Sequence, residues 1–371
     1  MERVTLARSG DPFPGAAYDQ PCYRIPALAV TPSGRLVAVW DVRADWRDLP
    51  GAFDLAYRTS DDSGRSWGPA RVLRRHTSQR GFGDASLIVD PATGRIHCWH
   101  VASTGPSFFT AAAGASGAGL ELWLATSADD GESWEFRDFS ALKPEWAGGM
   151  FAASGNGIAL ARGTSAGALL QPFVLRDPLT SAHYAAVGTS SDGGESWHLG
   201  DVIGPDCDEG KVVELNDGSI LLHARATPRR RRAVSGNAGV TFGPVTEDPT
   251  LVDPACNGGL GRWGGRLVCS LLDDEATRRR LALRLSDDDG SSWSATVLVD
   301  GGAAGYSVVV ELPDGDLGLA YEFGNYEGIA FVRIARDEVG WDGSGPTLIP
   351  VAGTAGAALP PETAMGGRAG L

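Results

Sequence analysis

The stretch from Ser60 to Trp67 reads SDDSGRSW, and its pattern S-x-D-x-G-x-S-W returns along the chain. The further copies are SADDGESW at 127–134, SSDGGESW at 190–197, SDDDGSSW at 286–293 and an eroded SGNAGVTF at 235–242, where Asn237 replaces the acid and Phe242 the tryptophan. Their first serines lie 67, 63, 45 and 51 residues apart. Such intervals suit one four-stranded unit each and predict a propeller or another array of repeats.

The residues of each copy are typical of a tight turn. Asp and Ser side chains can bond to the backbone of a turn, Gly supplies a positive φ, and the final Trp provides a large apolar anchor. Strand-like runs such as FDLAYRTS and LELWLATS stand before the copies. Helical periodicity is scarce, and Gly and Pro occur throughout. We therefore expect an all-β chain in which every copy closes a hairpin and has a structural role.

Composition narrows the classes of function. The chain has 371 residues, of which 43% are hydrophobic, so it can bury a full core. A formal charge of -14 argues against a nucleic acid partner, despite the basic runs at 229–232 and 278–280. Five cysteines without a CxxC pair suit a reducing compartment better than a disulfide framework. Without an apolar run of about 20 residues or a signal peptide, we expect no membrane span and a cytoplasmic location, or secretion if a leader has been removed.

Arg24 stands out in the segment CYRIPALAVT, residues 22–31, because its neighbours suit a buried strand. Burying a guanidinium without a partner is costly. The position of Arg24 therefore raises the question of what its guanidinium group binds.

The YRIP motif occurs here together with several copies of the S-x-D-x-G-x-S-W pattern, which we call boxes. This combination resembles the bacterial sialidase (neuraminidase) family, over roughly residues 18–335. The resemblance implies a six-bladed β-propeller that removes terminal α-linked sialic acids from glycans or small sialosides, with no metal or organic cofactor. It also implies one catalytic domain over residues 1–371, with a last strand and tail from about 340.

The family binds the substrate carboxylate with three arginines, whose planar guanidinium groups match a carboxylate in geometry and charge. By resemblance, Arg24 of the RIP motif is the first. The second is assigned to Arg230, with Arg229, Arg231 and Arg225 as rivals. The third is assigned to Arg278, with Arg279 as its rival.

The same resemblance assigns the catalytic groups. Tyr306, in AGYSVVVELPDGDLGLAYE, matches the family's nucleophile, and a neutral phenol suits an anomeric carbon that already carries a carboxylate. Glu214, in KVVELNDG, is expected to activate it. Asp48, before a Pro-containing loop, is expected to protonate the leaving oxygen, with Asp45 as the alternative.

Five further residues carry over as substrate contacts or their supports. Arg43 is expected near O4 of the sugar, and Asp84 near O4 or the N-acetyl group, although Gly83-Asp84-Ala85 departs from the family's commoner S-D-P. Glu322, in LAYE, is expected to hold Arg24, while Phe108 and Phe151 are candidate walls of the N-acetyl pocket. The acidic run at 206–209 is expected to line the cleft beside Glu214.

Two other functions remain open from the sequence. One is a propeller that binds sialic acid without catalysis, which need not keep Asp48, Glu214 and Tyr306 together. The other is a hydrolase or transferase of a related nonulosonic or ulosonic acid, for which the unusual loop at Asp84 would be the place of change.

Overall fold

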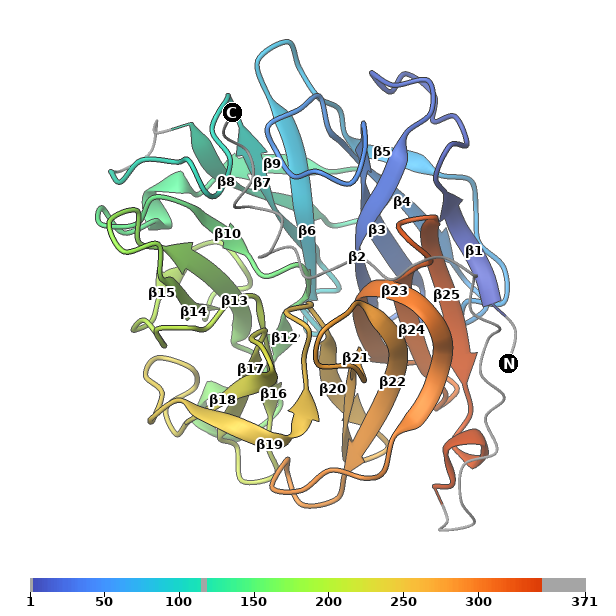
Figure 1. The fold of residues 1–371 in the computed structure, drawn as a ribbon, viewed down its shortest axis with the longest axis vertical. Coiled ribbons are helices and arrows are strands. Elements are labelled where there is room, and N and C mark those ends of the chain that lie inside the picture. Colours follow the sequence, from blue (N-terminus) through green and yellow to red (C-terminus); the bar gives the residue numbers. More distant parts are fainter. Residues whose placement is uncertain (1–2, 115–118, 342–371) are drawn as a thin grey trace.

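Six antiparallel blades stand around a central axis in this computed structural model, which describes residues 3–114 and 119–341 (Figure 1). Blade 1 contains β2 (Cys22–Val30), β3 (Leu36–Arg43), β4 (Asp54–Ser60) and β5 (Arg71–Arg74). Blade 2 contains β6 (Gly81–Val89), β7 (Ile96–Ser103), β8 (Leu120–Ser127) and β9 (Glu135–Asp138). Blade 4 contains β16 (Gly210–Glu214), β17 (Ile220–Ala224), β18 (Arg229–Ser235) and β19 (Thr246–Val252).

Blade 3 has a divided innermost strand. Both β10 (Met150–Ala152) and β12 (Ile158–Ala159) pair with β13 (Leu169–Arg176), which continues to β14 (His183–Ser190) and β15 (His198–Leu199). Between the two pieces, β11 (Gly155–Asn156) leaves the blade and pairs in parallel with β6 of blade 2. The backbone near residue 154 is therefore released from the ladder of its own blade.

Blades 5 and 6 share one long strand, β23 (Val297–Glu311), within a single seven-stranded sheet. Its first part pairs with β22 (Arg279–Ser286), next to β21 (Arg266–Leu272) and β20 (Gly259–Trp263). Its second part pairs with β24 (Leu317–Phe323), followed by β25 (Gly328–Ile334). The N-terminal strand β1 (Arg3–Arg8) adds to β25 as the fourth strand of blade 6, so the two ends of the ring meet there.

Helical structure in the described ranges consists of three short 3-10 turns, Ser140–Leu142, Gly163–Ser165 and Asp337–Val339. None of these residues forms a helix long and apolar enough to cross a membrane. The last strand and tail expected from about residue 340 fall almost wholly outside the described residues.

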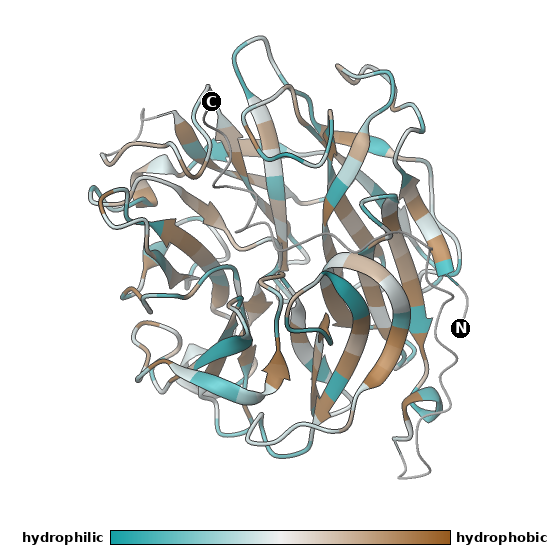
Figure 2. Cartoon of the chain, viewed as in Figure 1, coloured by the Kyte–Doolittle hydropathy of each residue, from teal (hydrophilic) through white to brown (hydrophobic). Residues whose placement is uncertain are grey.

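Hydrophobic residues concentrate along the strands (Figure 2). Their buried side chains form clusters shared by neighbouring blades. Leu28 and Trp40 of blade 1, for example, share a cluster with Val308 and Phe331 of blade 6. Full burial of such a side chain contributes roughly 1.5–3 kcal/mol. The core is thus a ring of inter-blade layers that surrounds the axis.

The repeated boxes connect the third and fourth strands of five blades. In the first box, Asp62 accepts hydrogen bonds from the Ser60 hydroxyl (2.8 Å), the Ser66 backbone N–H (2.8 Å) and the Ser66 hydroxyl (2.6 Å). Gly64 has φ +82°, and a Cβ there would collide with Phe331. The expected hairpin role of the boxes is confirmed.

Each box tryptophan also reaches the preceding blade. The pairs are Trp67 with Phe331, Trp134 with Tyr57, Trp197 with Trp99, and Trp293 with His223, at ring-centroid distances of 5.2, 6.0, 5.2 and 5.5 Å. The boxes therefore hold neighbouring blades together, at the end of the ring where the third strands end.

The boxes should make stability depend on acidic pH. Hydrogen bonds from serine hydroxyls lower the pKa of Asp62, Asp129, Asp192 and Asp288 to about 2. Because these pKa values lie below the ordinary value of about 3.9, the stabilisation is present above pH 4 and is lost as the pH falls towards 2. We expect the urea midpoint to fall over this range.

Asn237 shows how to test this dependence. Its amide accepts from the Ser235 hydroxyl and donates to Thr241, so a neutral group can keep the turn. We expect Asp288→Asn to lose less stability than wild type between pH 4 and pH 2. Parallel falls of the two urea midpoints would show that the Asp288 carboxylate does not contribute to the pH dependence.

Candidate active site

The pocket at the other end of the ring lies where the innermost strands begin. Arg24, Asp84 and Phe151 stand at the starts of β2, β6 and β10, and Glu209 directly precedes β16. The loops between second and third strands complete it with Asp48, Phe108 and Arg225. The propeller topology thus brings residues far apart in sequence to one mouth. The space in the pocket, with its open mouth included, is about 560 Å³. The pocket is lined by Asp48, Leu49, Asp84, Val101, Phe108, Phe109, Leu120, Phe151, His183, Asp208, Glu209, Arg225 and Tyr306.

Three arginines surround the ring of Tyr306. The guanidinium carbons of Arg24, Arg225 and Arg278 lie 5.6, 5.9 and 5.6 Å from its centroid. All three side chains are buried. The Arg278 guanidinium also donates to the Ala255 carbonyl (2.8 Å) and the Tyr326 hydroxyl (3.2 Å). This concentration of positive charge favours an anion in front of Tyr306.

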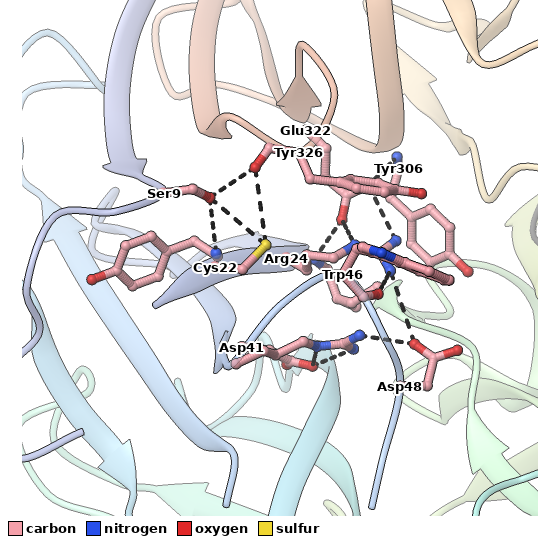
Figure 3. A network of polar contacts seen from close by, with 12 residues as sticks. Ser9, Cys22, Arg24, Asp41, Trp46, Asp48, Tyr306, Glu322 and Tyr326 are labelled. Carbon is pink, nitrogen blue, oxygen red and sulfur yellow. Dashed lines mark hydrogen bonds and ion pairs between the residues drawn. The ribbon is translucent and has the colours of Figure 1, made fainter. Parts of the chain in front are cut away.

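Arg24 has a carboxylate partner, Glu322. Its Nε donates to Glu322 Oε1 at 3.0 Å, and its Nη1 donates to the Trp46 carbonyl at 2.7 Å (Figure 3). Glu322 also accepts the backbone N–H groups of Ile25 (2.9 Å) and Tyr306 (3.0 Å). A Cβ at Gly305 would collide with the Glu322 carboxylate, so glycine is required next to Tyr306. The ion pair expected between Arg24 and Glu322 is present.

Tyr306 is hydrogen-bonded to Glu209 and not to Glu214, the acid expected from the sequence. The Tyr306 hydroxyl donates to Glu209 Oε2, and Arg225 Nη1 donates to both the Tyr306 oxygen (2.6 Å) and Glu209 Oε2 (2.8 Å). Burial raises the pKa of Glu209, while the charge of Arg225 opposes this rise. A carboxylate with a raised pKa is a better proton acceptor for a phenol.

Glu214 lies at the wrong end of its strand to meet Tyr306. Five residues separate it from Glu209, which corresponds to about 16 Å along an extended chain. There its carboxylate accepts the backbone N–H groups of Ala161 (2.8 Å) and Arg162 (3.0 Å). The assignment of Glu214 as the activating base is therefore wrong, and Glu209 occupies that position. The acidic run 206–209 does line the pocket, but beside Tyr306.

Arg230 also lies away from the pocket. It is buried within β18, where its Nη1 is 3.7 Å from Asp253 Oδ2. Arg225, one of its rivals, directly follows β17 and faces the mouth. The prediction of Arg230 is therefore corrected to Arg225, since the loop after a second strand reaches the site and the middle of a third strand does not. Of the two candidates for the third arginine, Arg278 faces Tyr306. Arg279 is exposed and donates a hydrogen bond to Asp274 (2.6 Å).

Asp48 is held across the pocket by Arg43. Arg43 Nη1 donates to Asp48 Oδ1 at 2.8 Å, and the Asp48 side chain is 44% exposed, so its other oxygen can face a ligand (Figure 3). Arg24 Nη1 lies 3.9 Å from the same Asp48 oxygen. Asp45, the alternative acid, is partly exposed and paired with Arg47 outside the pocket.

Asp41 is a buried acid that the sequence prediction missed. Its Oδ2 accepts from Arg43 Nη2 at 2.6 Å, and its Oδ1 accepts the Asp84 backbone N–H at 3.1 Å. Burial raises the pKa of Asp41 to about 6, although Arg43 lowers it. Burial and the Asp41 charge likewise raise the pKa of Asp84. A Cβ at Gly83 would stand 2.8 Å from Asp41 Oδ2, which explains the glycine before Asp84.

Aromatic side chains form the other wall of the pocket. Phe108 and Phe151 meet edge to face at 5.0 Å, and both line the cavity as expected. His183, also unforeseen, packs against Phe108 and lies 3.1 Å from Asp208. Although burial opposes its ionisation, Arg225 and His183 lower the pKa of Asp208 to about 2. The pocket therefore has a charged half and an apolar half.

Comparisons with known proteins agree on one family. Residues 34–319 match the model of the BNR repeat-like domain. A sialidase from Micromonospora viridifaciens is 36% identical over 354 residues, covering 89% of this chain and 54% of the relative. A sialidase from Bacteroides fragilis (strain YCH46) is 27% identical, covering 81% of this chain and 60% of the relative. The chain thus spans little more than half the length of these curated relatives.

Solved structures support the same architecture. The structure of the Hadza microbial sialidase Hz136 has a TM-score of 0.77 and 26% identity, covering 85% of this chain and 66% of the other. The intramolecular trans-sialidase from Ruminococcus gnavus, solved with oseltamivir carboxylate, has a TM-score of 0.78, covering 90% and 99%. Its 18% identity is informative about the fold alone. The chain therefore belongs to the BNR repeat-like family, within the group of sialidases that its relatives represent.

Proposed function

We propose that this protein is a retaining exo-α-sialidase that uses Tyr306 as its nucleophile. The observation that carries the proposal is the hydrogen bond from the Tyr306 hydroxyl to Glu209, set among three arginines and opposite Asp48. The sialidases from M. viridifaciens and B. fragilis support the same substrate class.

Arg24, Arg225 and Arg278 would bind the carboxylate that a sialic acid carries on its anomeric carbon. Glu322 holds Arg24 in place, and backbone carbonyls hold Arg24 and Arg278. Because these contacts fix the guanidinium groups before a ligand arrives, little ordering free energy is lost on binding. The anomeric carbon then lies over the Tyr306 oxygen.

In the first step, the Tyr306 oxygen attacks the anomeric carbon while its proton passes to Glu209. Asp48 donates a proton to the glycosidic oxygen, and the bond from that oxygen to the anomeric carbon breaks. The products are the free aglycone alcohol and a covalent sialyl-tyrosine, in which the phenol oxygen and the anomeric carbon form an aryl ketoside. Arg225, which contacts both Tyr306 and Glu209, stabilises the negative charge that develops on the phenol oxygen.

In the second step, Asp48 takes a proton from water, whose oxygen attacks the anomeric carbon from the side that the aglycone has left. The bond to Tyr306 breaks, and the phenol oxygen recovers its proton from Glu209. Two inversions at one carbon leave the α configuration unchanged. Each step uses protein side chains and water.

The apolar half of the pocket suits the acylamino group of the sugar. Phe108, Phe151 and Leu120 line this half. Asp84, at the charged edge, would contact the O4 side. Arg43 is fully buried behind the pocket lining, 3.5 Å from Asp84, and would support Asp84 instead of touching the sugar. A sugar with a hydroxyl in place of the acylamino group would leave the aromatic wall without an apolar partner.

The test compares two fluorogenic aryl α-ketosides, one of N-acetylneuraminic acid and one of its deaminated analogue with a hydroxyl at C5. We expect release from the first, with the α anomer as the first product in a ¹H NMR time course. Release from the second alone would move the proposal to a related nonulosonic acid. If the protein binds free sialic acid but releases the aryl group from neither substrate, the proposed function would change from a sialidase to a propeller that only binds the sugar.

A further inference from the structure

Lysine is rare in this chain, and its two positions are informative. Of the 32 basic residues only Lys143 and Lys211 are lysines, and both are buried, with exposures of 5% and 1%. The surface therefore uses arginine for its positive charges. A lysine ammonium differs from a guanidinium because it is compact and its pKa shifts readily on burial.

Lys211 lies on β16, the first strand of blade 4, close to Glu209 of the proposed active site. It stands two residues after Glu209, so both side chains lie on the same side of the extended chain. Its Nζ donates to Asn257 Oδ1 (2.7 Å) and to the Ser154 carbonyl (2.6 Å). That carbonyl is available because the backbone leaves blade 3 between β10 and β11.

Asn257 connects the ammonium of Lys211 to Glu209. Its Nδ2 donates to Glu209 Oε1 (3.1 Å) and to the Ser154 carbonyl (2.9 Å). An ammonium can only donate, so Lys211 fixes the amide with its oxygen towards Nζ and its N–H groups towards Glu209. One oxygen of Glu209 thus accepts from Asn257, and the other faces Tyr306 and Arg225.

Charged neighbours shift the pKa values of both Lys211 and Glu209. Burial lowers the pKa of Lys211 to about 7, while Glu209 raises it and Arg230 lowers it further. Glu209 in turn faces Lys211, Arg225, Asp208 and Tyr306. Below neutral pH, Lys211 is therefore a cation that favours the ionised form of Glu209.

We propose that Lys211 and Asn257 are positioning residues that orient Glu209 and keep it ionised as the proton acceptor of Tyr306. The inference rests on the proposed function, because it assigns Glu209 the role of activating the nucleophile. It adds a buried cation, outside the pocket lining, that controls the pH range in which this activation works.

The first test measures the coupling without any substrate. Lysine labelled with ¹³C at Cε gives two side-chain signals in this chain, and Lys143→Met identifies that of Lys211. We expect Lys211 to titrate well below an ordinary lysine and Glu209→Gln to lower its midpoint further, because an anion is removed. The matched control is Glu214→Gln, on the same strand. Equal Lys211 midpoints in wild type and Glu209→Gln would overturn the proposal.

The second test follows the pH profile of aryl sialoside hydrolysis in Lys211→Met, which keeps the chain length and removes the charge. We expect kcat/KM near neutral pH to fall about 10- to 100-fold, the range found when the partners that orient metal ligands are removed. The acidic limb should move up by about one pH unit, because Glu209 loses a stabilising cation. Lys143→Met, which removes the other buried ammonium from the carbonyls of Gly114 and Ala147, should leave that limb in place.

The two tests separate failure of the inference from failure of the proposed function. Wild type without sialoside turnover would reject the proposed function, while the NMR titration would still report whether Lys211 and Glu209 communicate. An active Lys211→Met variant with an unmoved acidic limb would reject the positioning role and leave the sialidase proposal intact.

Discussion

Replacing Tyr306 by phenylalanine is expected to lower kcat for aryl and natural sialosides by about 10³-fold or more, since the proposed covalent intermediate forms on the Tyr306 oxygen. The ring stays in place among Arg24, Arg225 and Arg278, so binding of free sialic acid should persist. The expected signature is therefore loss of turnover with retained affinity. Steady-state kinetics and calorimetric titration with sialic acid measure the two quantities.

Tyr321 provides a matched control for this change. It is also fully buried, and its hydroxyl donates to a carboxylate, Asp300 Oδ2, at 2.9 Å. Its pKa is raised by burial and by Asp300, but it does not line the pocket. Tyr321→Phe should lose stability and keep kcat. Near-normal turnover in Tyr306→Phe, or an equal loss in both variants, would contradict the nucleophile assignment.

The repeats were predictable from sequence because each box closes its own bonds within eight residues. Ser60, Asp62 and Ser66 bond to one another, so the pattern is visible without knowledge of the rest of the fold. Blade 6 has no such box, and its outer strand β1 pairs with β25 from the other end of the chain. Its place in the ring could come only from family resemblance. The detour of β11 has no sequence signal that we can identify.

Register decided which site predictions were wrong. Glu209 and Glu214 occupy one segment, as do Arg225 and Arg230, and only the ends of β16 and β17 show which member reaches the mouth. A five-residue error along a strand moves a side chain from one end of the blade to the other. The boxes mark the end of the ring opposite the pocket. This fact would have favoured Glu209 over Glu214, because Glu209 precedes β16 and Glu214 ends it.

Asp41 could have been found by the reasoning that singled out Arg24. It is a charged residue within the apolar run LVAVWDVR, where an unpaired carboxylate would be costly. Its partner Arg43 stands two residues later, on the same face of β3. By contrast, Glu322 lies 298 positions from Arg24, and only the fold or a resemblance could join them.

Replacing Asp48 by asparagine should impair substrates according to their leaving groups. An alkyl aglycone, as in a natural glycan, needs a proton as it departs, and loss of a general acid typically costs about 10²–10⁴-fold in rate. An aryl aglycone with a low pKa leaves as an anion and should lose much less in the first step. Asparagine can still accept from Arg43, which keeps the loop in place. The measurement is kcat/KM over a series of aryl sialosides and sialyllactose.

Asp45→Asn is the matched control, because Asp45 stands in the same loop, is partly exposed and pairs with Arg47 outside the pocket. Its kcat/KM should show the leaving-group dependence of wild type. Asp48→Asn should instead give a steep dependence on the pKa of the leaving alcohol, since the bond to the anomeric carbon breaks without protonation. A slope equal to that of wild type in Asp48→Asn would mean that another group donates the proton. A steep slope in Asp45→Asn would restore Asp45 as the acid.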